Sequence, residues 1–357
     1  MPGSMPRIIF EGFCNEQSIF TTLMNRLKHK NIKIFLNYVL GPLLFIWLSH
    51  SIFKQIKNQP HLEDSWLNIK TSFTDTRVIN FLVVFILMFV NWSLEALKWK
   101  ISVQSVQPVS FFTSLKAIFS GVSFSITTPN RIGEYLGRML YMNDGNRLKV
   151  ISLTILGSLS QLIVTVLFGL VGLLILQFEI DKLNLPEWLQ WIKDIGIAGG
   201  IIGLIFLTVF YFRIGWLVKW IDKIPAIKKY IWLINELEKA DTTLLLRLLS
   251  ISLLRYLVFA TQYFLLFRFF GVEVNWWQGF WGIAIVFFIM AIIPSIELFE
   301  VVGKVIVTQE IFAIFTANTL AIGFVPTTIW FINLVVPAAI GSLLILGIKF
   351  FKKDEAS

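Results

Sequence analysis

The sequence predicts an all-α protein that crosses a membrane several times. Hydrophobic residues make up 56% of the chain and charged residues only 15%, whereas soluble domains hold about 45–50% and about 25%. Several apolar runs reach the roughly 20 residues that a spanning helix needs. No run shows the polar–apolar alternation over about ten residues that is typical of a transmembrane barrel. We therefore expect a polytopic helical membrane protein.

The apolar runs predict about eight spans, each bounded by polar or charged residues. They lie at about 34–53, 78–98, 109–127, 150–177, 195–213, 244–270, 277–293 and 318–349. The last run exceeds the length of one span and contains Pro326 and Pro337, so we expect a long, kinked helix or a helix with a broken start. One transmembrane domain at 34–350 then separates a basic segment at 1–33 from a tail at 351–357.

The connection at 214–243 has an amphipathic pattern. Tryptophans and aliphatic residues recur at helical spacing, with lysines around them, as in Trp216-Leu-Val-Lys-Trp220. Such a pattern is typical of a helix that lies in the membrane interface. A basic loop with a few anchoring tryptophans explains it equally well.

Lysine and arginine placement predicts the orientation of the chain. Basic residues flank both the first and the last apolar run, so both termini should be cytoplasmic. Eight simple crossings would then place the acidic connection 178–194 inside and the lysine-rich 214–243 outside. Both conflicts disappear if 109–140 and 277–305 are hairpins that return to their side of entry. Residues 78–98 and 244–270 then cross in opposite senses, as in the inverted repeats of transporters.

A gapless alignment of 106–129 with 271–294 gives this repeat some support in the sequence. Few positions are identical, but Pro129 aligns with Pro294. With one inserted residue, Glu134-Tyr-Leu-Gly137-Arg138 then falls beside Glu300-Val-Val-Gly303-Lys304. We expect repeat halves at about 78–177 and 244–349, joined through 214–243.

The stretch 127–138, TTPNRIGEYLGR, places charges, a proline and two glycines between apolar runs. Proline ends a helix and glycine permits close approach of backbones or ligands, so we expect a helix break near Pro129 and a new helix from about Gly133. The free N–H groups of that helix, with Arg131 and Arg138, would form an anion site suited to phosphate. Glu134 lies four residues before Arg138 and can pair with it on one helix face. The alternative is an ordinary charged loop in solvent.

Other charged residues within spans are candidates for the same site. Glu297 and Glu300 follow an uninterrupted apolar run, and ionisable groups at membrane depth are costly and commonly functional. Arg255 lies deep in 244–270 and is a better cavity candidate than Lys98, Lys100 or Arg268, which we expect to extend toward the interface from span ends. Glycine pairs near Gly199 allow close helix packing, more readily within the chain than in a dimer.

Several function classes lack a signature in the sequence. One cysteine, Cys14, and three histidines without metal-ligand spacing predict no metal site. No nucleotide-binding or zinc-protease motif occurs, so we expect no cofactor and no ATP hydrolysis. The net charge of +9 fits cytoplasmic loops that face anionic lipid better than it fits nucleic acid.

The stretch from Pro129 to Arg138 resembles the Pro-x3-Gly-Glu-x3-Arg signature of the flippase-like transmembrane family, which includes the transmembrane region of lysylphosphatidylglycerol synthase. The resemblance covers about 34–350 and leaves no room for the aminoacyl-transferring domain of the synthase. It also implies a second motif late in the chain, here Pro294-Ser-Ile-Glu-Leu-Phe-Glu300, which lacks the usual glycines. For a family member without that domain, the resemblance implies that the protein translocates lipids and lies in a plasma membrane of bacterial type.

Three functions remain open at this stage. The first is a lipid flippase or transporter that binds the phosphate of an anionic phospholipid or a polyprenyl-phosphate-linked lipid. Its binding residues would be Arg131, Glu134, Arg138, Arg255, Glu297, Glu300 and Lys304, with hinge residues Pro129, Gly133, Gly137, Pro294 and Gly303. The second is an intramembrane enzyme that modifies such a headgroup. The third is a non-catalytic membrane partner of a lipid-modifying enzyme.

Overall fold

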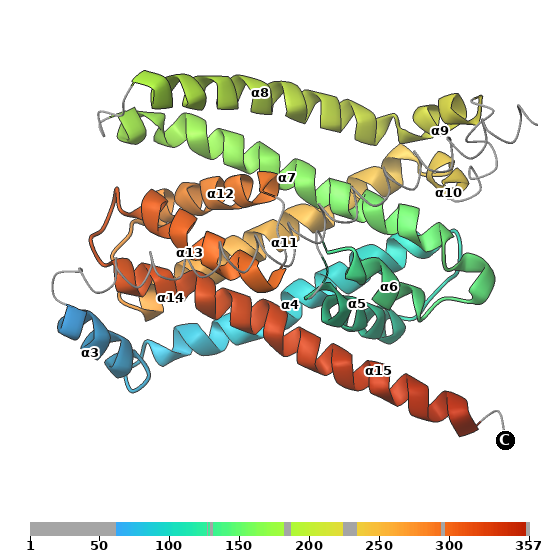
Figure 1. The fold of residues 1–357 in the computed structure, drawn as a ribbon, viewed down its shortest axis with the longest axis horizontal. Helices are drawn as coiled ribbons and strands as arrows, with labels where there is room; N and C mark the ends of the chain where they lie inside the picture. Colours follow the sequence, from blue (N-terminus) through green and yellow to red (C-terminus); the bar gives the residue numbers. More distant parts are fainter. Residues whose placement is uncertain are drawn as a thin grey trace, which may run out of the picture. The chain divides into compact units, whose positions relative to one another are not determined.

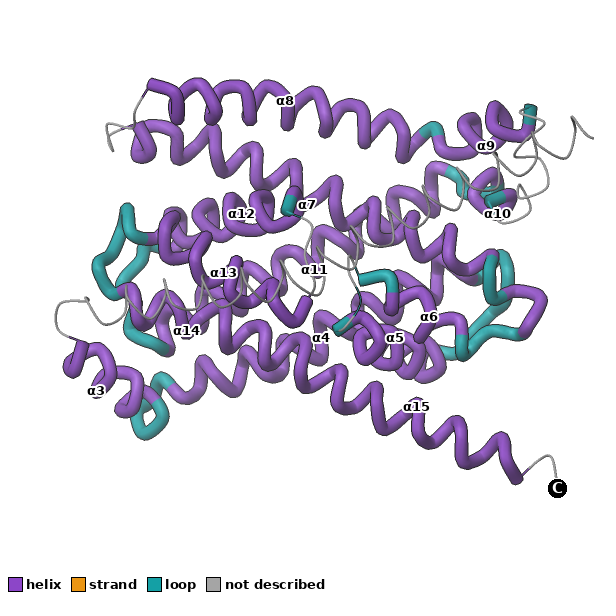
Figure 2. The backbone as a smooth tube through the Cα atoms, viewed as in Figure 1, coloured by secondary structure: helices purple, strands orange, loops and turns teal. Residues whose placement is uncertain are grey.

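A computed structural model describes residues 62–126, 128, 131–181, 187–223, 234–293 and 297–354. All of them lie within one compact unit, residues 55–357. The predicted span at 34–53 and the basic segment 1–33 lie outside the described residues. Within the described part the chain forms helices and loops but no strand, as Figure 2 shows. The predicted all-α class is confirmed.

The helices follow the predicted apolar runs closely (Figure 1). The first half contains α3 (Leu62–Ser72), α4 (Val78–Val103), α5 (Phe111–Ser125), α6 (Gly133–Met139), a 3-10 turn (Asp144–Asn146) and α7 (Lys149–Asp181). The middle contains α8 (Glu187–Phe212), α9 (Ile214–Asp222) and α10 (Asn235–Glu238). The second half contains α11 (Thr242–Phe269), α12 (Trp276–Ile292), α13 (Glu297–Phe312), α14 (Thr319–Trp330), a π-helical turn (Phe331–Val335) and α15 (Val336–Asp354).

Five stretches of the described part are long and apolar enough to cross a membrane. They are Val78–Val103, Lys149–Gln177, Asp194–Phe212, Thr242–Phe269 and Thr319–Ile345. The predicted runs at 109–127 and 277–293 form α5, with 15 residues, and α12, with 17 residues. Both are shorter than the ~20 residues that one crossing needs.

Each of these short helices begins at a capping side chain. The Ser110 hydroxyl accepts a hydrogen bond from the Thr113 N–H at 3.1 Å, and the Asn275 side chain accepts one from the Trp277 N–H at 3.2 Å. Such caps satisfy N–H groups that the first turn leaves without a partner. Ser110 and Asn275 occupy equivalent positions in the alignment of 106–129 with 271–294. The two helices therefore start at the same point of the proposed repeat.

Both short helices belong to antiparallel hairpins. Next to α5, the N–H of Asn143 after α6 bonds to Oε1 of Gln107 before α5 at 3.0 Å, so the chain returns to where the hairpin began. In the second hairpin, Phe312 at the end of α13 lies against Gly282 near the start of α12. Figure 1 shows the two hairpins entering from opposite ends of the helices, the first from the right and the second from the left.

The two halves pack reciprocally. Helix α4 packs along α11, while α5 packs on α15 and α12 packs on α7. Close backbone approach makes both hairpin contacts possible: a Cβ on Gly341 of α15 would clash with the carbonyl of Phe119 in α5, and one on Gly169 of α7 would clash with Phe288 of α12. Each hairpin thus packs against the last helix of the other half, which is the pattern that a two-fold repeat produces.

The structure refines three predicted segments. Residues 318–349 form one continuous helical path in which a π-helical turn follows Pro326, so the helix start is not broken. Helices α7 and α8 extend well into the predicted 178–194 connection. Residues 214–222 form a helix, α9, whose Ile214 and Val218 are buried while Trp216 and Trp220 face outward.

Candidate functional site

A cavity of about 650 Å³ lies where the hairpins meet the long helices. One part of its lining is charged and comes from α4, α6, α11, α13 and, with Arg131, the turn before α6. Another part is aromatic and aliphatic: Trp92, Tyr256, Phe259, Tyr263, Phe287, Met290 and Trp330. A cavity lined by both charged and apolar side chains suits an amphiphilic ligand.

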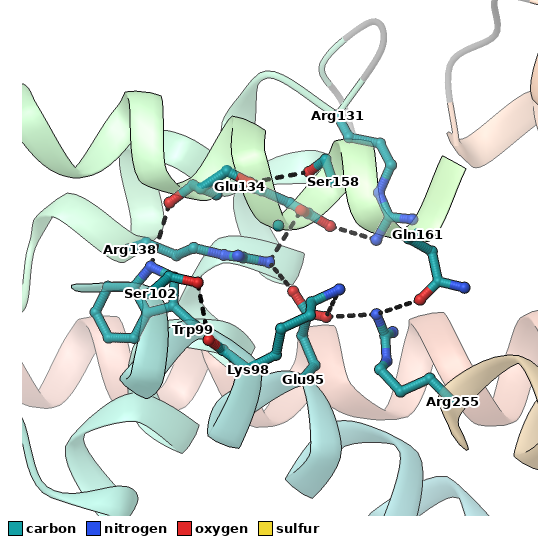
Figure 3. Close-up of polar contacts among 12 residues, drawn as sticks. Glu95, Lys98, Trp99, Ser102, Arg131, Glu134, Arg138, Ser158, Gln161 and Arg255 are labelled. Atoms are coloured by element: carbon teal, nitrogen blue, oxygen red, sulfur yellow. Dashed lines mark hydrogen bonds and ion pairs between the residues drawn. The ribbon is translucent and has the colours of Figure 1, made fainter. Parts of the chain in front are cut away.

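Glu95 is the centre of the charged lining. It lies on α4 and accepts from Lys98 at 2.9 Å, from Arg138 at 3.0 Å and from Arg255. Figure 3 shows these cations converging on its carboxylate from three helices. Because burial of a charge costs free energy unless the charge is paired, this contact set ties α4, α6 and α11 together.

Lys98 differs from its sequence-based prediction. We expected its ammonium group to extend to the interface, but the residue is only 2% exposed. Its Nζ pairs with Glu95 and lies 3.5 Å from the Ser252 hydroxyl on α11. The prediction of snorkelling is wrong because Lys98 faces α11 and the cavity.

The first motif contributes a chain of ion pairs. Arg138 bonds to Glu134 at 3.1 Å, as the i, i+4 spacing predicted, and Arg131 also pairs with Glu134. Arg138 is 3% exposed, so it is no part of a solvent loop. Arg131 has a φ of 58°, a left-handed backbone that redirects the chain between α5 and α6. Half of its side chain remains exposed at the edge of the cavity.

Arg255 is held by three groups from two other helices, α4 and α7. Its Nε donates to Asn91 Oδ1 at 3.1 Å, while one terminal nitrogen reaches Glu95 and Gln161 Oε1, the latter at 3.3 Å. Asn91 and Gln161 were not predicted as site residues. An amide placed to accept from a buried arginine fixes the plane of the guanidinium, and thereby the direction of its remaining donors.

The glycines of the first motif allow close packing within the first hairpin. A Cβ at Gly133 would clash with the Phe124 carbonyl, and one at Gly137 would clash with the Gly121 backbone. These contacts let α6 lie directly on α5. A Cβ added at Gly303, the matching glycine of the second motif, would meet only the Met290 side chain, at 3.5 Å. Gly303 therefore does not provide the close helix packing that Gly133 and Gly137 allow.

The helix N–H groups that we expected to contribute to the anion site are not free. The Gly133 N–H donates to Thr128 Oγ1 at 2.8 Å, and the Glu134 N–H donates to the Arg131 carbonyl at 3.0 Å. These N–H groups are therefore already satisfied within the chain. The capacity to bind an anion lies in the guanidinium and ammonium groups instead.

The second motif borders the same cavity. Glu300 and Lys304 line it and pair with each other at 2.8 Å. Pro129 and Pro294 lie outside the described residues, as does the side chain of Glu297. Of the seven predicted binding residues, the six whose side chains are described all line this cavity: Arg131, Glu134, Arg138, Arg255, Glu300 and Lys304. In the described part, no group of three or more His, Cys, Asp or Glu side chains is placed to hold a metal ion.

The comparison with protein families agrees with the motif. The family described as "Lysylphosphatidylglycerol synthase TM region" matches residues 35–315. The chain belongs to this family. No curated protein matches it.

Membership in the lysylphosphatidylglycerol synthase TM region family makes the chain a multi-pass membrane protein of a lipid-handling family. The matched region contains α4 to α13, and therefore the whole charged lining of the cavity.

Proposed function

We propose that this protein is a flippase or transporter that moves an anionic phospholipid or lipid-linked intermediate across the membrane. The observation that carries this proposal is the meeting of two distant motifs, at 131–138 and 300–304, in one cavity that Arg255 also lines. Among the described side chains that line the cavity, five are cationic and three are carboxylates, an excess of two positive charges. Such an excess favours an anionic headgroup.

The apolar lining supports a lipid over a soluble anion. Ile292 and Ile293 border the cavity at the tip of α12 and are 64% and 47% exposed. Arg131, at the tip of the other hairpin, is half exposed. In this proposal the headgroup enters between the hairpin tips, the arginines bind its phosphate, and its chains stay along the aliphatic edge. The hairpins are re-entrant segments whose tips lie near the middle of the bilayer.

Reconstitution tests this proposal. Purified protein in liposomes should speed the exchange of a headgroup-labelled anionic phospholipid between leaflets, measured by the quenching of outer-leaflet fluorescence. Mass spectrometry of the same lipids should find no new species. New lipid species would instead favour an intramembrane enzyme, and neither exchange nor new species would favour a non-catalytic partner.

A further inference from the structure

A row of neutral polar side chains follows one face of α7 along the cavity. Ser158, Gln161 and Thr165, which we call the α7 row, recur at the i, i+3 and i+7 spacing of a single helix face, and all three line the cavity. At a rise of about 1.5 Å per residue, the row is about 10 Å long. Ser158 is exposed, while Gln161 and Thr165 are half-buried. Their polar atoms are therefore accessible to a ligand.

The hydroxyls of the α7 row do not tie α7 to another helix in the way that a neighbouring serine does. Ser160 is buried and bonds to the hydroxyl of Ser252 on α11 at 2.8 Å. Ser158 and Thr165 instead donate to carbonyls of α7 itself, at 3.2 Å and 2.9 Å. A hydroxyl oxygen has two acceptor lone pairs. Each of these two oxygens can therefore accept a hydrogen bond from a ligand in the cavity.

The α7 row begins at the charged lining. Gln161 Oε1 accepts from Arg255 at 3.3 Å, and Figure 3 shows this oxygen turned toward the guanidinium. The amide nitrogen, with its two N–H donors, then points away from Arg255. Ser158 lies next to Tyr135 of α6, which also lines the cavity and follows Glu134 in the chain. A phosphate bound at the arginines would thus have neutral donors and acceptors directly beside it.

The chemistry of the row favours hydroxyl groups over an amine or an alkyl group. None of the α7 residues in the described lining is charged, and each carboxylate of that lining already pairs with a cation. A headgroup ammonium would therefore lack a counter-ion. An alkyl headgroup would exclude water from the row without replacing its hydrogen bonds. Hydroxyl groups both donate and accept, and they match the oxygens and the amide of the row.

We infer that the α7 row is a subsite for a polyol or sugar that is attached to the phosphate of the lipid. This inference rests on the proposed function and specifies its substrate class. The arginines bind the phosphate, and the hydroxylated group lies along α7 beyond it. The length of the row, about 10 Å, accommodates one sugar ring or a shorter polyol next to the phosphate.

Three lipids with identical tails and one negative charge each test this subsite. Dioleoyl phosphatidylinositol, phosphatidylglycerol and phosphatidylpropanol are titrated against the detergent-purified protein, with binding measured by native mass spectrometry at pH 7.5. We expect phosphatidylinositol to bind about tenfold tighter than phosphatidylpropanol, the factor that two neutral hydrogen bonds supply. Phosphatidylglycerol, with its smaller polyol, should bind severalfold tighter than phosphatidylpropanol.

The outcomes separate this inference from the proposed function. If neither hydroxylated lipid binds tighter than phosphatidylpropanol, the polyol subsite is overturned and the proposed function stands. Binding of none of the three lipids overturns both. Inositol monophosphate, titrated in the same way, should bind at least tenfold more weakly than phosphatidylinositol because it lacks the chains that contact the apolar lining. Equally tight binding would make this a site for a free polyol phosphate and overturn the lipid assignment.

A double variant tests whether the α7 row causes the preference. Ser158→Ala with Thr165→Val removes two hydroxyls and keeps every charge, so the ratio of phosphatidylinositol to phosphatidylpropanol affinity should fall from about ten toward one. The control is Ser250→Ala with Thr261→Val. It removes two exposed hydroxyls of α11 that bond back to their own helix in the same way but do not line the cavity, and it should leave the ratio unchanged. An unchanged ratio in the α7 variant would exclude the row as the polyol subsite.

Discussion

At the residue scale, the charged lining was predictable where a motif or deep burial in a span marked it. Arg131, Glu134 and Arg138 follow from the motif and Arg255 from its depth in an apolar run. Glu95 and Lys98 were missed as site residues because they end an apolar run, where long charged side chains commonly reach the interface. Their roles depend on α11 packing along α4, which brings Arg255 and Ser252 to them across 154–160 positions of sequence. A single sequence contains no signal for that contact.

Removal of the Glu95 carboxylate should destabilise the fold. Glu95→Gln leaves Lys98, Arg138 and Arg255 without their shared counter-ion, and breaking a buried pair in this way costs about 3–5 kcal/mol. We expect a clearly lower midpoint of thermal unfolding, followed by intrinsic fluorescence in detergent. Glu273→Gln, at an exposed position between α11 and α12, is the control and should unfold like the wild type. Equal midpoints for both variants would show that Glu95 is not a required counter-ion.

Arg138 should contribute to lipid binding through its geometry as well as its charge. Arg138→Ala removes the pairs with Glu95 and Glu134 and a phosphate donor. Hydrogen bonds to charged groups are worth about 1.5–3 kcal/mol, so we expect a roughly ten- to hundredfold loss in lipid affinity. Arg138→Lys should recover only part of it, because lysine lacks the planar fork. Lipid binding and translocation are measured on variants first shown to be folded. Wild-type behaviour of both variants would contradict a headgroup site at Arg138.

At the element scale, apolar length and turn chemistry predicted the helices well, and tertiary contacts decided the rest. The break after α5 followed from proline and glycine, but which approach the glycines allow did not. Gly133 and Gly137 were predicted as hinge residues that permit close approach of backbones or ligands, and in the fold they bring α6 onto the backbone of α5. Glycine in a motif indicates close approach, and only the fold shows to what. The π-helical turn after Pro326 likewise depends on how one long helix fits its neighbours.

The two motif glycines at equivalent positions should respond differently to alanine. A Cβ at Gly137 clashes with the Gly121 backbone, whereas one at Gly303 meets the flexible end of Met290 at 3.5 Å. Gly137→Ala should cost about 1–3 kcal/mol through overpacking of the hairpin. Gly303→Ala should be neutral or slightly stabilising, because alanine favours helices. Thermal unfolding of the two variants checks this pair. The prediction is wrong if Gly303→Ala lowers the midpoint as much as Gly137→Ala does.

At the scale of the whole transmembrane unit, charge placement and packing agree on two opposed halves. The sequence predicted that 78–98 and 244–270 cross in opposite senses, and α4 and α11 do run in opposite directions (Figure 1). The reciprocal packing of each hairpin on the last helix of the other half could not be predicted, because it requires contacts between α5 and α15 and between α7 and α12. This reciprocal packing also explains why two motifs far apart in sequence border one cavity. One helix of each hairpin packs on the last helix of the opposite half.

The orientation in the membrane is the last expectation, and single cysteines can test it in a background with Cys14 replaced. We expect cysteines at Gln104, Gly145 and Lys219 to react with an impermeant label only from the cytoplasm, because their end of the unit also carries the basic flank of α15. Cysteines at Glu273 and Ala317, at the opposite end, should react from outside. All five positions are exposed.

Gln104 precedes the first hairpin and Gly145 follows it, so this pair decides whether the hairpin is re-entrant. Labelling of the two from opposite sides of the membrane would mean that 109–140 crosses it. If all five positions react from the sides opposite to those expected, the hairpins are still re-entrant but the orientation of the protein in the membrane is the reverse of the predicted one. An inverted repeat of two re-entrant hairpins allows one result. Gln104 and Gly145 must be labelled from the same side of the membrane, and Glu273 and Ala317 from the other side.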